Sequence, residues 1–70
     1  MRKILSPVAG SVFRIQALVG SRVAVDDEVM LIESMKMELP VLADIAGEVT
    51  ALLVAQGDVV KEGQPLLLLA

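Results

Sequence analysis

Short apolar runs alternate with turn residues along the whole chain, and no stretch shows the spacing of an amphipathic helix. A glycine with a polar neighbour marks turns at Gly20-Ser21 and Gly57-Asp58, and two more turns are indicated at Asp26-Asp27 and Glu62-Gly63-Gln64-Pro65. Valine-rich runs between closely spaced turns are typical of an all-β sandwich or flattened barrel. We therefore predict strands at residues 3–6, 10–18, 22–25, 29–33, 38–43, 47–55, 59–61 and 65–69.

The two halves of the chain repeat each other. Residues 7–33 can be written over residues 44–70 without a gap, and apolar residues fall at the same points in both copies. A length of 70 residues predicts a single domain, residues 1–70, and the repeated halves predict a pseudo-two-fold axis within it. The identical pairs are Ala9/Ala46, Gly10/Gly47, Val12/Val49, Gly20/Gly57, Val23/Val60 and Leu31/Leu68.

The long strands of the two halves break the alternation of a regular strand at the same place. Val12 and Ile15 recur as Val49 and Leu52, at a spacing that cannot put both members of a pair on one face of a regular strand. We therefore expect a β-bulge or a change of sheet in each long strand.

Composition limits the chemistry that the chain can perform. Of its 70 residues 56% are hydrophobic, but there is one Phe and no Trp or Tyr. The absence of Cys and His excludes disulfides, Cys/His zinc sites and His-dependent nucleophiles. The net charge is −3 and the basic residues are scattered, so we expect no nucleic-acid partner. The apolar run 66–70 is too short to cross a membrane, and Ser6-Pro7 interrupts the only signal-like stretch, which favours a cytoplasmic protein.

One lysine stands between two methionines in the segment that joins the halves. Met35-Lys36-Met37 lies between the strands predicted at residues 29–33 and 38–43, so we expect Lys36 at a tight hairpin at the opposite edge from the termini. We call residues 34–37 the tip. A solvated turn lysine is the simplest interpretation, but exposed methionines beside it are typical of adaptable recognition surfaces, unless they fold back onto the sheet. Because a lysine amine is protonated in neutral water, a separate enzyme would have to acylate it.

The residues around this lysine resemble the attachment motif of biotinyl domains. Glu33-Ser34-Met35-Lys36-Met37-Glu38 is similar to that motif, whose core is Met-Lys-Met preceded by alanine or serine. Residues 44–49 and 56–66 resemble the second half of the same family, so the resemblance covers essentially the whole chain. It implies a flattened barrel of two four-stranded antiparallel sheets with the modified lysine on a hairpin, in agreement with the fold predicted from the repeat.

The resemblance also implies a function. Lys36 would be joined to biotin by a biotin protein ligase, and biotin would carry a carboxyl group, as carboxybiotin, from a biotin carboxylase to a carboxyltransferase. The parent enzyme would be an acetyl-CoA carboxylase or a related biotin-dependent carboxylase or decarboxylase. The domain itself would be a monomeric, non-catalytic carrier without a metal. The residues expected to be recognised by these partners are Glu33, Ser34, Met35, Met37 and Glu38.

The chain departs from some biotinyl domains in two respects. The gapless repeat leaves no room for the thumb loop that some of them insert in the first half, against the biotin. The chain also reaches Ser6-Pro7 soon after Met1, without the Pro/Ala-rich linker of many relatives, which fits either a free-standing carrier or an excised domain.

Other functions stay open beside the biotin carrier. A lipoyl domain shares the fold, but its lysine usually lies in an Asp-Lys-Ala setting, whereas Met35 and Met37 flank the lysine here; a carrier that accepts both groups is a further alternative. An unmodified β-hairpin interaction module is disfavoured because such modules in export-pump adaptors have separated halves. An autonomous enzyme is the least favoured, and the acidic turn 26–28 is expected to be a solvated one.

Overall fold

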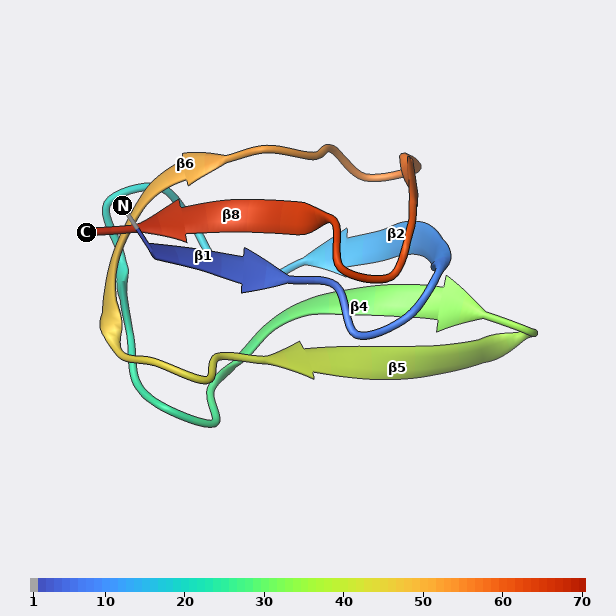
Figure 1. Ribbon diagram of the computed structural model, residues 1–70, viewed down its shortest axis with the longest axis horizontal. Helices are drawn as coiled ribbons and strands as arrows, with labels where there is room; N and C mark the ends of the chain where they lie inside the picture. The colour runs from blue at the N-terminus through green and yellow to red at the C-terminus, as the bar shows by residue number, and fades with distance from the viewer. Residues whose placement is uncertain (1) are drawn as a thin grey trace.

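The computed structural model describes residues 2–70, which form strands and turns and contain no helix long and apolar enough to span a membrane (Figure 1). The all-β fold predicted from the turn spacing is therefore confirmed. The strands are β1 (Arg2–Leu5), β2 (Gly10–Ile15), β3 (Arg22–Val23), β4 (Glu28–Ser34), β5 (Met37–Leu42), β6 (Gly47–Leu52), β7 (Val59–Val60) and β8 (Pro65–Leu69).

Two four-stranded antiparallel sheets make up the molecule. One has the strand order β1-β8-β6-β3, and the other has the order β5-β4-β2-β7. The sequence repeat maps β2, β3 and β4 onto β6, β7 and β8, and β5 takes the place that β1 has in the other sheet. Each sheet is thus a copy of the other, which confirms the pseudo-two-fold symmetry predicted from the repeat.

Each long strand carries an irregularity at the predicted position. The register between β2 and β4 shifts between Val12 and Arg14, and the register between β6 and β8 shifts between Val49 and Ala51. The expected break in regular pairing, predicted as a bulge or a change of sheet, is confirmed in both halves as a register shift.

The strand predicted at residues 10–18 is too long, because β2 ends at Ile15. The next two amides, of Gln16 and Ala17, both donate to the carbonyl oxygen of Val29, at 3.0 and 3.1 Å, and the ladder with β4 ends there. The next apolar residues, Leu18 and Val19, are exposed and are not part of the strand. The prediction from apolar character alone therefore made this strand too long. The strands predicted at 22–25, 47–55 and 59–61 also end early, at Val23, Leu52 and Val60.

Aliphatic side chains fill the space between the sheets. Ser6 is the only buried polar residue among residues 2–70, and its hydroxyl donates to the carbonyl oxygen of Val8 at 2.7 Å. Burial of each large aliphatic side chain stabilises the fold by roughly 1.5–3 kcal/mol relative to its exposure. The buried hydrophobic residues are Ile4, Val12, Ala17, Val23, Val29, Met30, Ile32, Val41, Ala43, Val49, Val60, Leu66, Leu67 and Leu69.

The acidic turn after β3 is exposed, as predicted, and one of its carboxylates has a structural use. Asp27 accepts a hydrogen bond from the backbone N–H of Ala24 at 2.8 Å. Asp26 has a φ of 74°, a conformation that aspartate tolerates better than most residues. In the second half Gly63 takes the place of Asp26, with a φ of 82°, and Gln64 takes the place of Asp27.

Candidate functional site

The tip is the turn of the hairpin between β4 and β5. Ser34 and Met37 form the last cross-strand pair, and Met35 and Lys36 make the two-residue turn. Their φ angles are 51° and 65°, and positive φ at both central residues is the pattern of a type I′ turn, whose twist matches that of the flanking strands. The tight hairpin predicted for Lys36 is confirmed, and it lies at the opposite end of the molecule from both termini (Figure 1).

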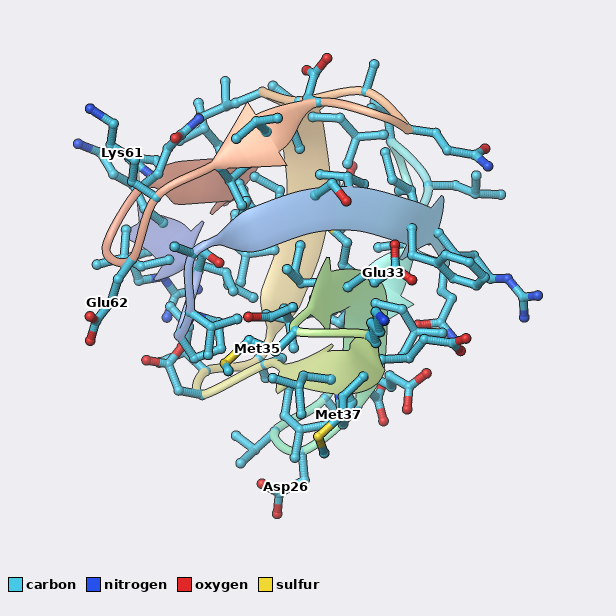
Figure 2. All side chains as sticks on the ribbon, turned by 90° about the vertical axis from the view of Figure 1, so that its right-hand side faces the viewer. Asp26, Glu33, Met35, Met37, Lys61 and Glu62 are labelled. Atoms are coloured by element: carbon cyan, nitrogen blue, oxygen red, sulfur yellow. The ribbon has the colours of Figure 1, made fainter. Side chains whose placement is uncertain are left out.

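The side chains of the Met-Lys-Met sequence are in solvent. Met35 is 92% exposed, Met37 is 61% exposed, and Lys36 is exposed as well. Lys36 makes no side-chain hydrogen bond or ion pair with any of residues 2–70. Figure 2 shows the side chains of Met35 and Met37 leaving the hairpin in different directions. The amine is therefore accessible between two exposed thioethers, and neither methionine folds back into the core.

Two glutamates lie immediately below the tip. Glu33 on β4 and Glu38 on β5 are directly opposite each other, next to the pair formed by Ser34 and Met37, and both are exposed. Like charges directly opposite each other destabilise a pair of strands. This arrangement has no benefit for the hairpin itself, but it presents negative charge to any partner that approaches the tip.

The root of the hairpin is fixed in the core. Met30 and Ile32 on β4 and Val41 on β5 are at most 2% exposed. The molecule measures 31 × 19 × 18 Å, and the hairpin projects along its length (Figure 1). The tip is therefore supported by a two-stranded hairpin whose base is packed in the core, and not by a loose loop.

Strand β2 supports the last residues before the tip. Ser11 and Val12 pair with Glu33 and Ile32 of β4. Gly10 lies so close to β4 that a Cβ atom on it would be 2.8 Å from Ile32 Cγ2 and closer still to the carbonyl oxygen of Glu33. The sequence repeat singled out this glycine, but its position beneath the tip was not predicted.

Met35→Asn is expected to raise the free energy of unfolding by up to about 1 kcal/mol, because left-handed backbone costs most side chains roughly 1–2 kcal/mol and costs asparagine less. Little burial is lost, since the Met35 side chain is 92% exposed. Urea denaturation measures the change. Met37→Asn is the matched control, because Met37 is also exposed but lies in β5 without a positive φ. An equal gain in both variants would argue against strain in the turn.

Comparison with known sequences identifies the family. Residues 2–69 match the family described as "Biotin-requiring enzyme". The chain belongs to the biotin/lipoyl attachment family. The family inferred from the Met-Lys-Met motif is thereby confirmed. The two four-stranded antiparallel sheets of the structure agree with the fold that the resemblance implied.

Individual relatives carry the same association. The chain is 38% identical over 60 residues to the "Biotin/lipoyl attachment protein" of Bacillus subtilis, covering 86% of this chain and 82% of that protein. It is 34% identical over 65 residues to the "Biotin carboxyl carrier protein" of Streptococcus mutans, covering 93% of this chain and 50% of that protein. The likeness therefore identifies a carrier-type domain.

The fold recurs inside a much larger enzyme. The crystal structure of the Kluyveromyces lactis urea carboxylase superposes with a TM-score of 0.91 at 32% identity, covering 99% of this chain. The chain corresponds to 6% of that protein, so the likeness concerns one carrier-like part of it.

Proposed function

We propose that a biotin protein ligase attaches biotin to Lys36, and that the domain presents this biotin to a biotin carboxylase and a carboxyltransferase. The observation that carries the proposal is the tip. An exposed lysine without a partner among residues 2–70 stands on a projecting turn between two exposed methionines, in a family of biotin-requiring proteins.

The attachment step needs an accessible amine. After losing its extra proton, Nζ of Lys36 would form an amide bond with the carboxyl carbon of an activated biotin. The bond from that carbon to the activating group breaks, and a second proton leaves the nitrogen. No side chain among residues 2–70 forms a hydrogen bond or ion pair with the amine of Lys36. The base that removes the proton must therefore come from the ligase.

The ligase and the carboxylase partners would recognise the residues that flank Lys36. Met35 and Met37 offer adaptable apolar contacts on either side of the amine, and Glu33 and Glu38 add negative charge below it. A ligase or carboxylase surface complementary to the tip would therefore combine apolar pockets with basic residues.

The remaining residues of the domain would act as a rigid support for the tip. Biotin, when bound, supplies a carrier for a carboxyl group, and the chain holds this carrier away from the body of the domain. Tethering raises the effective concentration of the carrier at each active site that it visits. The names of the relatives, a biotin carboxyl carrier protein and a urea carboxylase, support carboxylase partners for this chain.

The test is intact mass spectrometry of the chain after co-expression with a biotin protein ligase, followed by fragmentation. We expect one biotinyl group, on Lys36 and not on Lys3 or Lys61. A parallel co-expression with a lipoate ligase is expected to leave the chain unmodified. A biotinyl group on another lysine, or a lipoyl group in place of biotin, would contradict the proposal, and no modification by either ligase would favour an interaction module.

A further inference from the structure

The methionines of the chain differ sharply in their access to solvent. Met30 lies in the core with an exposed fraction of 0%, whereas Met35 and Met37 are 92% and 61% exposed. The exposed pair flanks the lysine of the tip, in the turn and at the first position of β5. Exposure of a methionine side chain decides how readily an oxidant reaches its sulfur.

We propose that Met35 and Met37 are sites of reversible oxidation that switches off recognition of the tip. The inference rests on the function proposed above for Lys36. In each event the thioether sulfur donates an electron pair to one oxygen of a peroxide, and the O–O bond breaks. That oxygen stays on the sulfur as a sulfoxide, and the other leaves as water or an alcohol after taking up a proton. The sulfur is oxidised by two electrons and the peroxide is reduced by the same two.

The structure indicates that this oxidation would change the surface and spare the fold. Neither exposed methionine belongs to the core, and the turn is defined by backbone conformation and the pairing of Ser34 with Met37. A sulfoxide replaces an apolar, flexible contact with a polar and chiral one. An apolar pocket on a ligase would then have to accept a strongly polar oxygen, and the cost of burying it without a hydrogen bond weakens binding. Oxidation of Met30, by contrast, would put that oxygen into the core.

The experiment treats the unmodified chain with hydrogen peroxide and follows oxidation of each methionine by peptide mass mapping. Met35 and Met37 are expected to gain oxygen at least about tenfold faster than Met30. The rate of biotin attachment by a purified ligase is then compared before and after treatment. We expect a loss of about tenfold or more, since the apolar contact is worth roughly that factor. Treatment with the methionine sulfoxide reductases of both epimer specificities and a dithiol should restore the rate.

The double variant Met35→Leu/Met37→Leu provides the matched control. Leucine has a similar volume but no sulfur, and the variant keeps Met1 and Met30 in place. Peroxide should therefore leave its attachment rate unchanged relative to its own untreated sample, whatever that rate is. A parent chain that is modified equally fast with Met35 and Met37 oxidised would overturn the switch. The untreated parent chain distinguishes failure of the oxidation switch from failure of the proposed function. If the untreated chain does not take up biotin on Lys36, the proposed function is contradicted.

Discussion

Lys36→Arg is expected to carry no biotin, while it unfolds at nearly the same temperature as the parent chain. Amide formation needs a primary amine that can lose a proton, and a guanidinium remains protonated throughout the accessible pH range. The substitution keeps the net charge of −3, so a loss of attachment cannot be ascribed to a change in charge. Lys36 is exposed and has no partner among residues 2–70, so the free energy of unfolding should change by less than about 0.5 kcal/mol.

Intact mass spectrometry after incubation with the ligase measures the loss, and thermal unfolding checks the fold. Lys61→Arg is the matched control, because Lys61 is also an exposed lysine beside a turn but lies outside the tip. This control should take up one biotinyl group as fast as the parent chain. Attachment that persists in Lys36→Arg, or that disappears in Lys61→Arg, would place the modified amine elsewhere.

The fold could be predicted largely because the two halves of the chain have matching sequence patterns. A turn signal or a bulge that is ambiguous in one half is supported by the same residue type in the other, as with Val12 and Val49. The position of Lys36 was predicted from the same repeat, because strands were expected on both sides of the segment that joins the two copies. The tip is the turn between those strands, β4 and β5, within one sheet. The proposal that biotin is attached there came from the motif, because the repeat carries no information about ligands.

Backbone conformation at special positions could not be predicted. Met35, Lys36 and Asp26 all have positive φ, and only aspartate is a residue type that signals it. Strand ends were also missed, because the exposed apolar residues Leu18 and Leu53 were predicted to continue β2 and β6. In both cases tertiary geometry overrides the conformational preference of the residue. The local sequence pattern is therefore not enough to predict these backbone conformations and strand ends.

The two ends of the sandwich differ although the two sheets repeat each other. By the repeat, the pairing of β1 with β8 is the counterpart of the pairing of β4 with β5. At the end away from the tip, Arg2 donates hydrogen bonds to the carbonyl oxygens of Ala46 and Ala70 at 3.0 and 2.8 Å. The hairpin of β4 and β5 ends instead in an exposed turn that carries Lys36.

Gly10→Ala is expected to lower the free energy of unfolding by about 3 kcal/mol, near the upper end of the cost of forcing an extra methyl group into a packed site. The new Cβ would be 2.8 Å from Ile32 Cγ2 and would overlap the carbonyl oxygen of Glu33, which cannot move without shifting β4. A domain of this size has a total stability of roughly 4–10 kcal/mol, so the loss is a large fraction of it. Urea denaturation measures the effect.

Gly47→Ala shows whether this change acts through stability alone. Gly47 is the counterpart of Gly10 in the repeat, and its Cβ would lie 2.8 Å from the carbonyl oxygen of Ala70, at the end of the molecule away from the tip. We expect both variants to lose stability, but only Gly10→Ala should also slow biotin attachment at a temperature where both remain folded, because it displaces Glu33 beneath the tip. Equal attachment rates in the two folded variants would show that the close approach of β2 supports the sheet without positioning the tip.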